Sequence, residues 1–162
     1  MQLRRETDAD RFEVEALYDL CFAPGREALS SYRLREGISP VAELCLVARD
    51  DLGILGAAIR FWPVSVASKP VLLLGPIAVH PTRQGEGLGG HLMLESLSIA
   101  RDLGWQRVLL VGDAPYYSRF GFSRLSDVRM PAPTNPDRVL GLDLIPGAWK
   151  GVAGAVARWS GL

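Results

Sequence analysis

Short apolar runs alternate along this 162-residue chain with stretches in which apolar residues recur at helical spacing. Runs rich in Val, Leu and Ile predict strands, which we place at residues 2–6, 43–48, 54–61, 71–79, 107–111, 122–125 and 139–145. Apolar positions three or four residues apart predict helices, which we place from Thr7 to before Pro24, at 26–36 and at 89–103. Strands interleaved with helices indicate an α/β fold with a mixed sheet.

The predicted helices differ in how clearly their ends are marked. The first begins with Thr7 and acidic residues in its first turn, and its apolar positions are Phe12, Ala16, Leu17 and Leu20. The second ends at Gly37, and the third, which has the clearest pattern, ends at Gly104. A proline in the first turn also suits one or two helical turns at 115–120.

Glycine and proline mark the connections. Residues 50–53 predict a hairpin turn, and residues 63–70 and 131–136 predict irregular loops. Gly75-Pro76 interrupts the strand 71–79, so we expect that strand to bulge or to part from a neighbour there. Residues 147–162 hold too many glycines for an assignment. Without a repeat or a composition break, we expect one domain over residues 1–162.

The composition limits the classes of partner that we expect for this chain. The chain has 18 basic and 18 acidic residues, which provides no overall positive charge for nucleic acid or an anionic membrane. The longest apolar run has about nine residues, well short of the ~20 that span a bilayer, and the charged N-terminus does not resemble a signal peptide. Cys21 and Cys45 in apolar surroundings suggest buried thiols in the cytoplasm. Two histidines cannot form a histidine-rich metal site, so we expect no metal.

Residues 84–90 form a glycine-rich stretch directly before the helix 89–103. Such a turn suits a phosphate, because backbone N–H groups and the positive end of the helix dipole point at it. A Walker A loop needs a lysine that is absent here. A dinucleotide loop fits the letters, since Gly85, Gly87 and Gly90 match G-x-G-x-x-G and Asp113 follows about 20 residues later. However, five residues separate the strand from Gly85, and few elements follow it.

A third interpretation covers more of the chain. Gln84-x-x-Gly87-x-Gly89 follows the run Ile77–Pro81, and Tyr117-x-x-x-Gly121-Phe122 comes after the next strand. These two segments and their spacing resemble the GNAT superfamily of N-acetyltransferases. The resemblance covers residues 3–125, with its motif core at about 71–122. The segments 112–117 and 142–147 further resemble a bacterial subgroup of predicted N-acetyltransferases.

The resemblance implies a fold, a co-substrate and a site. The fold is a mixed, mostly antiparallel sheet flanked by helices and splayed at the strand before the loop. Acetyl-CoA is the co-substrate, and its amide arm pairs with the edge of that strand at Ile77, Ala78 and Val79. The pyrophosphate lies on backbone N–H groups, while Gln84 adds a side-chain donor. The implied loop residues are Gln84, Gly85, Glu86, Gly87, Leu88, Gly89 and Gly90.

The resemblance also places a general acid at Tyr117, which protonates the departing thiolate. The competing interpretation of Tyr117 is a core aromatic residue. Tyr116 faces elsewhere if this turn is helical, so packing or substrate lining suits it better. A backbone N–H near Val79 is a candidate for stabilising the oxyanion. The sequence does not identify a base, and Glu43, Asp113 and His80 are all weak candidates; His80 suits a turn and Asp113 a helix cap.

We therefore expect direct acetyl transfer to a primary amine of a small molecule or peptide, with no nucleic acid or membrane partner. Two alternatives stay open: a nicotinamide-dependent oxidoreductase, and a GNAT-like domain that binds acyl-CoA without catalysis. The acceptor pocket is expected between the first two helices and the loops 63–70 and 131–136. GNAT proteins often form dimers, so a homodimer is one option for this chain.

Overall fold

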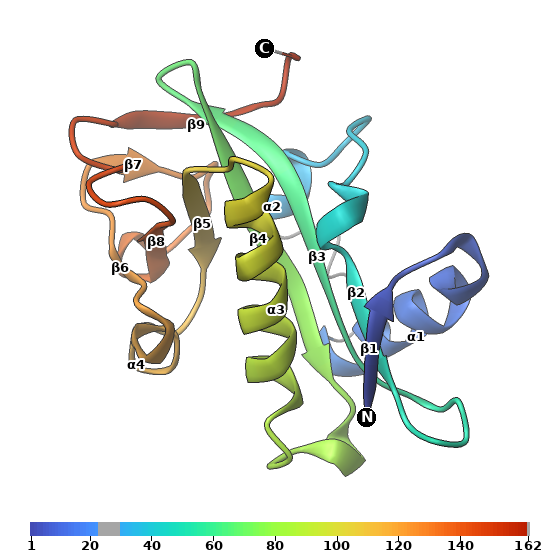
Figure 1. Ribbon diagram of the computed structural model, residues 1–162. Coiled ribbons are helices and arrows are strands. Elements are labelled where there is room, and N and C mark those ends of the chain that lie inside the picture. Colours follow the sequence, from blue (N-terminus) through green and yellow to red (C-terminus); the bar gives the residue numbers. More distant parts are fainter. Residues whose placement is uncertain (23–29, 162) are drawn as a thin grey trace.

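The computed structural model describes residues 1–22 and 30–161. Its strands form one sheet in the order β1-β2-β3-β4-β5-β8-β6, and β9 pairs with both β3 and β7 (Figure 1). The strands are β1 (Gln2–Arg5), β2 (Leu46–Arg49), β3 (Leu55–Val66), β4 (Lys69–Val79), β5 (Arg107–Val111), β6 (Ser123–Arg124), β7 (Val128–Arg129), β8 (Val139–Asp143) and β9 (Gly154–Arg158). The helices are α1 (Arg11–Phe22), α2 (Ser30–Arg33), α3 (Leu88–Asp102) and α4 (Ala114–Tyr117).

The sheet is mostly antiparallel, as the fold prediction required. The parallel pairs are β4–β5 and β7–β9. A doubly wound dinucleotide fold needs a mainly parallel sheet, so this topology argues against the oxidoreductase alternative.

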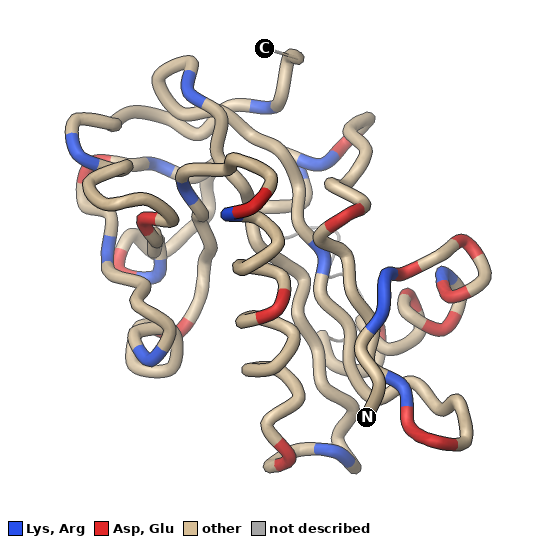
Figure 2. Tube along the Cα trace, viewed as in Figure 1, with Lys and Arg blue, Asp and Glu red and all other residues tan. Residues whose placement is uncertain are grey.

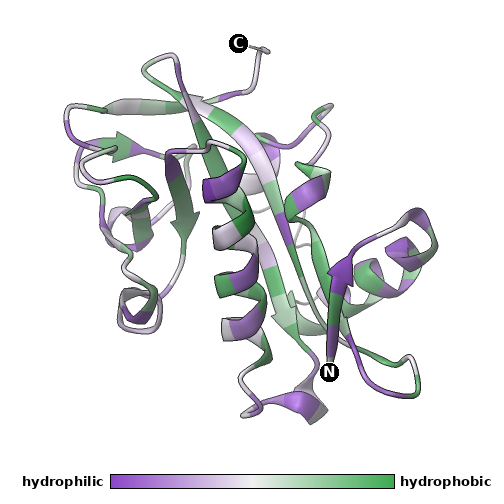
Figure 3. Cartoon of the chain, in the orientation of Figure 1, coloured by the Kyte–Doolittle hydropathy of each residue, from purple (hydrophilic) through white to green (hydrophobic). Residues whose placement is uncertain are grey.

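Helices cover both faces of the sheet. α3 lies on one face and α1 on the other (Figure 1). The inner side of α3 supplies Leu92, Met93 and Leu97 to the larger core cluster, while its outer side mixes hydrophilic residues with the exposed Leu94 (Figure 3). Because α3 carries the glycine loop at its start, this packing fixes the direction in which the loop faces.

The helix α1 exists as predicted, but of its four predicted apolar positions, Leu17 is buried and the other three are exposed. Phe12 and Leu20 are 85% and 57% exposed, whereas Val14, Leu17 and Tyr18 are buried. Val14, Leu17 and Tyr18 also follow helical spacing, so periodicity alone allowed a face rotated about the helix axis. The contacts of α1 with β3 and β4 decide which face is buried.

The predicted loop at 63–70 is wrong, because strands occupy nearly all of it. β3 continues to Val66, a turn at Ala67 and Ser68 reverses the chain with φ of 50° and 63°, and β4 starts at Lys69. Pro63 is tolerated inside β3 because its nitrogen faces away from β4. On that edge, pairing with β2 ends at Ile59 and pairing with β9 begins at Val64, so no ladder hydrogen bond is lost.

The predicted bulge in β4 is confirmed, and the sheet opens beside it. Opposite two steps of β3, from Ile59 to Phe61, β4 takes three, from Ile77 to Leu74. β4 and β5 pair only at Leu72 with Val108 and at Leu73 with Leu109. Beyond Leu73, no strand of the described residues lies beside the edge of β4 that faced β5, and the two strands diverge (Figure 1).

Side chains of the neighbouring strand β3 and of α1 hold the bulge. The Trp62 indole N–H donates to the Gly75 carbonyl at 2.9 Å, and the Tyr18 hydroxyl donates to the Pro76 carbonyl at 3.2 Å. These bonds satisfy two carbonyls that the bulge takes out of the ladder. These two hydrogen bonds therefore stabilise the bulge beside which the sheet opens.

The remaining predictions differ at element ends. Residues 42–44 form a 3-10 turn, so β2 starts later than the predicted strand 43–48. Of the predicted helix 26–36, residues 30–33 are helical, while 26–29 lie outside the described residues. β9 lies within the unassigned stretch 147–162. Charges of both signs are dispersed along the chain (Figure 2), and none of the described helices is long and apolar enough to cross a membrane.

Candidate active site

The glycine loop connects the end of β4 to the start of α3. A 3-10 turn at residues 81–83 follows β4, and α3 begins at Leu88. Gly85 and Gly87 have φ of 86° and 78°, a left-handed conformation that costs glycine little and other residues more. These two glycines turn the chain so that the first turn of α3 faces the open side of the sheet.

The loop has the properties of an anion cradle. Within the described part of the chain, the backbone N–H groups of residues 85–90 have no protein acceptor, as expected for a helix start. A Cβ on Gly85 or Gly87 would meet nothing within 4 Å, so the backbone is open to a ligand. A cavity of about 480 Å³ lies over this loop, bounded by Val79, α3 and the rings of Tyr116 and Phe120.

The loop's long side chains are engaged by the protein itself. Gln84 donates from Nε2 to the Val79 carbonyl at 3.0 Å, which ties the loop to the end of β4. The predicted Gln84 donor to phosphate thus has another partner here and stays a prediction. Arg83 pairs with Asp50 at 2.5 Å and lies 3.7 Å from Glu86.

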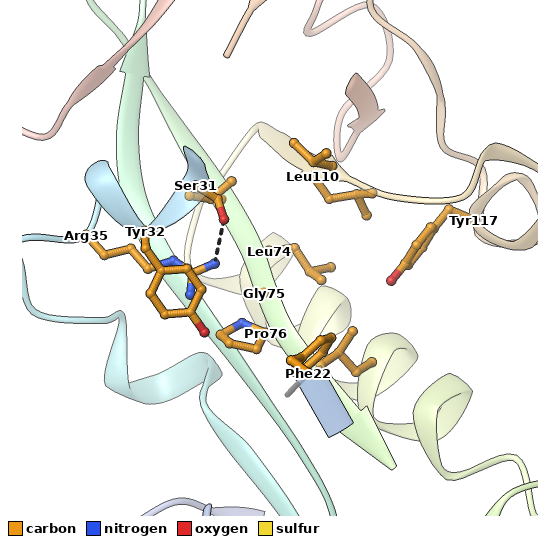
Figure 4. A pocket seen from close by; sticks show the side chains of 12 residues that line it. Phe22, Ser31, Tyr32, Arg35, Leu74, Gly75, Pro76, Leu110 and Tyr117 are labelled. Carbon is orange, nitrogen blue, oxygen red and sulfur yellow. Dashed lines mark hydrogen bonds between the residues drawn. The ribbon is translucent and has the colours of Figure 1, made fainter. Parts of the chain in front are cut away.

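A second cavity, of about 140 Å³, lies where the sheet opens. β4 contributes the bulge and Leu74, β5 contributes Leu110, and Tyr117 closes one side (Figure 4). Phe22 of α1, Ser31 and Tyr32 of α2 and Arg35 in the turn after α2 form the other side. Along β4, this cavity adjoins Leu73–Ile77 and the loop cavity adjoins Val79. The two cavities therefore follow one another along the open edge of the strand.

Tyr117 combines packing with access to this cavity. Its ring lies against Phe122 and over Gly112, where a Cβ would come within 2.5 Å of Cε2. Its hydroxyl has no hydrogen-bond partner among the described residues and points into the cavity (Figure 4). Burial, assisted by the neighbouring Tyr116, raises the pKa of Tyr117 to about 12. The phenol therefore keeps its proton at neutral pH.

The two adjacent tyrosines face different cavities, as predicted from helical geometry. Their rings meet edge to face, with centroids 4.9 Å apart. Tyr116 lines the loop cavity, and its hydroxyl lies 3.4 Å from the position of a Cβ on Gly89. The predicted cap is also confirmed, because the Asp113 carboxylate accepts the Tyr116 N–H at 3.1 Å.

The weak candidates for a base are not brought to Tyr117's cavity. Asp113 caps α4, Glu43 lies in the turn before β2, and His80 accepts the Thr82 N–H at 3.2 Å. None of the three lines the cavity at the sheet opening. Within the described residues, no three His, Cys, Asp or Glu side chains are grouped to hold a metal ion.

The pocket expected for the acceptor amine differs from the prediction in one respect. The segment 63–70 is a hairpin and does not line the cavity. α2 does line it, and the loop after residue 130 braces α2: Ser30 and Thr134 share a hydrogen bond of 2.6 Å, and Arg33 donates to the Ala132 carbonyl at 2.7 Å. α1 contributes Phe22, as expected.

Sequence reasoning missed two cationic residues that line the cavities. Arg35 is buried at the sheet opening, with its guanidinium 4.0 Å from the Tyr32 ring centroid and 5.4 Å from that of Trp62. Arg119 lines the loop cavity. Arg35 follows a weakly patterned stretch, so the sequence held no signal for it. Arg119 lies inside the segment 116–122, where its place between aromatic residues was the available signal.

Comparison with known proteins supports the same class. The model of the "Acetyltransferase (GNAT) domain" family matches residues 42–124. The uncharacterized N-acetyltransferase YhbS of Escherichia coli K12 is 32% identical over 160 residues, which cover 96% of this chain and 95% of YhbS. YjhQ, an uncharacterized N-acetyltransferase of the same strain, is 42% identical over 129 residues, covering 77% of this chain and 71% of YjhQ.

Solved structures agree over almost the whole chain. The E. coli YhbS structure in complex with CoA has a TM-score of 0.84 and 31% identity, covering 98% of this chain and 89% of that one. A GNAT family acetyltransferase from Brucella melitensis in complex with acetyl-CoA has a TM-score of 0.74 and 30% identity, with coverage of 98% and 96%.

The fold and these matches define an acyltransferase with a splayed central sheet. The chain belongs to the GNAT family of N-acetyltransferases. The resemblance carried by the loop and by Tyr117-x-x-x-Gly121-Phe122 is thereby confirmed, as is the predicted enzyme class.

Proposed function

We propose that this chain transfers the acetyl group of acetyl-CoA to a primary amine of a small molecule or peptide. One observation carries the proposal: the glycine loop and Tyr117 lie at two ends of the same open edge of β4. From Val79 to Gly75 the strand advances by about 13 Å, at 3.3 Å per residue. An extended molecule with phosphate at one end and a thioester at the other suits this arrangement.

The phosphate end belongs at the loop. The backbone amides of residues 85–90 supply donors to the pyrophosphate, strengthened by the dipole of α3. Gly85, Gly87 and Gly89 let the phosphates approach the backbone, while Glu86 and Leu88 contribute main-chain N–H groups. Gln84 positions the loop through its bond to Val79. Ile77, Ala78 and Val79 offer the strand edge to the amide arm.

The reacting end belongs beside Tyr117. The amine nitrogen attacks the thioester carbonyl, the carbon–sulfur bond breaks, and the sulfur takes the proton of the Tyr117 hydroxyl. The nitrogen of the neutral amine becomes positively charged on attack and loses one proton to solvent. The Tyr117 phenolate takes one proton from solvent, so Tyr117 returns to its neutral form. A main-chain N–H near Val79 stabilises the oxyanion. The raised pKa of Tyr117 supports this role, because the proton is present when the thiolate forms.

Two assays test the proposal. Calorimetry compares the binding of acetyl-CoA with that of NAD and NADP, and a free-thiol assay follows CoA release with a panel of primary amines. We expect acetyl-CoA to bind and at least one amine to be acetylated. Binding of NAD(P) without acetyl-CoA binding would contradict the proposal. Acetyl-CoA binding without turnover of any amine would favour the non-catalytic module instead.

We also propose that residues 1–162 form a single domain, that the protein is cytoplasmic and that it forms a homodimer. Gel filtration with light scattering tests the homodimer directly, and a mass of about twice 17.7 kDa is the expected result.

A further inference from the structure

Two arginines, Arg83 and Arg119, line the cavity over the glycine loop, and their surroundings differ. The Arg83 guanidinium contacts Asp50 at 2.5 Å and Glu86 at 3.7 Å, so acidic groups of the protein already balance its charge. Arg119 has no ion pair with any carboxylate in the described part of the chain, and its side chain is exposed. Of the two, Arg119 is the cation whose charge the protein leaves unbalanced at this cavity.

Aromatic rings hold the Arg119 guanidinium beside the loop. Its central carbon lies 5.2 Å from the Tyr116 ring centroid and 5.8 Å from that of Phe120. The same two rings border the loop: Tyr116 lies 3.4 Å from a Cβ built on Gly89, and Phe120 lies 3.6 Å from one on Gly90. A guanidinium supported on ring faces keeps its N–H edge available for a planar, two-point contact.

We propose that Arg119 binds a phosphate at the nucleotide end of acyl-CoA. This inference rests on the proposed function above. The amides at the start of α3 form a fixed set of uncharged donors on one side of the cavity. CoA carries two kinds of phosphate at that end, the pyrophosphate and the 3′-phosphate, and a charged side chain across the cavity supplies a second set. Arginine suits this task because its fork matches phosphate oxygens.

The test measures the affinity for CoA and for dephospho-CoA, which lacks the 3′-phosphate, by calorimetry. The variants are Arg119→Gln, Arg119→Lys and the control Arg129→Gln, an exposed arginine of β7 outside both cavities. We expect Arg119→Gln to weaken CoA binding about three- to tenfold, as for a solvent-accessible charged pair. Arg119→Lys keeps part of the affinity, and Arg129→Gln has no effect.

The two ligands identify the phosphate. A loss seen with CoA and absent with dephospho-CoA assigns the contact to the 3′-phosphate, whereas an equal loss with both assigns it to the pyrophosphate. In steady-state kinetics we expect Arg119→Gln to raise the KM for acetyl-CoA and to leave the KM for the amine unchanged.

Unchanged affinity of Arg119→Gln for both ligands would overturn the inference, and so would an equal loss in Arg129→Gln. In either case, wild-type protein that binds acetyl-CoA and acetylates an amine leaves the proposed function standing. If the wild-type protein binds neither CoA nor dephospho-CoA, both the inference and the proposed function are wrong.

Discussion

At the scale of single residues, the site depends on where two neighbouring tyrosines point. A helical turn places Tyr116 over the glycine loop and Tyr117 in the cavity at the sheet opening. The phenol of Tyr117 is held by packing on Phe122 and Gly112, so its orientation needs no hydrogen bond. A proton donor with a raised pKa is thereby fixed at one point of the cavity wall.

Removing that hydroxyl separates catalysis from binding. We expect Tyr117→Phe to lower kcat by about 10²- to 10⁴-fold, the usual contribution of a positioned general acid. The affinity for acetyl-CoA stays within about twofold, because the ring and its packing remain. Steady-state kinetics and calorimetry measure the two effects, with Tyr116→Phe as the matched control. A Tyr117→Phe variant with wild-type kcat would remove Tyr117 from the acid role.

Gly89 allows a sharper test of the loop than the two turn glycines. It is helical, and an added Cβ would make only ordinary contacts of 3.4 Å to Tyr116 and 3.5 Å to Val79. We therefore expect Gly89→Ala to leave the melting temperature unchanged or slightly higher, since alanine favours a helix. The added methyl group obstructs the approach of phosphate, so the Kd for acetyl-CoA rises about tenfold, as overpacking of 1–3 kcal/mol implies.

The control for this variant is Ser98→Ala, which changes an exposed position of the same helix. Calorimetry with acetyl-CoA and thermal unfolding are measured on both proteins. Equal acetyl-CoA affinity in Gly89→Ala, Ser98→Ala and the wild type would mean that no phosphate lies against Gly89.

At the scale of elements, a buried carboxylate joins the start of α1 to β1 and β2. Asp10 is 2% exposed and accepts hydrogen bonds from Arg4 at 2.9 Å, Arg49 at 2.8 Å and the Thr7 N–H at 2.8 Å. Burial alone would raise the pKa of Asp10, but the Thr7 and Arg49 bonds together outweigh it and the pKa is lowered. The ionised form is therefore favoured in the folded protein.

This shift has a defined sign in pH. Because the folded pKa lies below the unfolded value near 3.9, the stabilisation is complete above that value and disappears as pH falls through the folded pKa. We expect Asp10→Asn to reduce the free energy of unfolding at pH 7 and to differ less from wild type below pH 4. Urea unfolding at several pH values measures this. Asp51→Asn, at an exposed turn, is the control, and a difference that does not change with pH would contradict the assignment.

Much of this element order was predictable from the sequence, because local patterns determine it. α3 and β5 were predicted within one residue of their bounds, since a strong period and a clear glycine end mark the helix. The hairpin at Ala67 and Ser68 was not predicted, because Pro63 and Pro70 suggest a loop until the unpaired edge of β3 is known. Likewise the burial of Val14 in place of Phe12 follows from which sheet face α1 meets.

The same distinction applies to the site. The loop and Tyr117 were found because each is a local motif, with a spacing that the sequence displays. The cavity between them was not fully predictable, since Phe22, Arg35 and Leu110 come from three elements far apart in the chain. Residues that share a cavity only through tertiary packing leave no pattern in the sequence.

At the scale of the whole molecule, the sheet must stay rigid while it is open on one side. Beyond Leu73, β3 is the one strand in the described part of the chain that pairs with β4, so the packing of α1 and β1 on the closed side gains importance. Arg60 of β3 lies at this junction. It donates to Glu6 after β1 at 3.0 and 2.8 Å and to Glu15 of α1 at 2.8 Å. Burial opposes its charge, yet these carboxylates hold the pKa of Arg60 above its usual value.

Arg60→Met tests whether this ion pair holds the closed side together. The variant keeps an apolar chain of similar length but leaves Glu6, whose side chain is 12% exposed, without its partner. We expect a loss of about 3–5 kcal/mol in the free energy of unfolding, as for a buried pair broken on one side. The double variant Arg60→Met/Glu6→Gln recovers part of that loss, because it removes the Glu6 charge that lost its partner.

Urea unfolding compares these proteins with Arg5→Met, which changes an exposed arginine of β1. Two results would contradict this role of the charge pair. One is a free energy of unfolding of Arg60→Met within 1 kcal/mol of wild type, and the other is a double variant as unstable as the single one. If the expected loss is found, α1 is attached to the sheet through charge as well as packing. Since α1 also supplies Phe22 to the cavity, destabilising this junction by Arg60→Met then raises the KM for the amine before it changes that for acetyl-CoA.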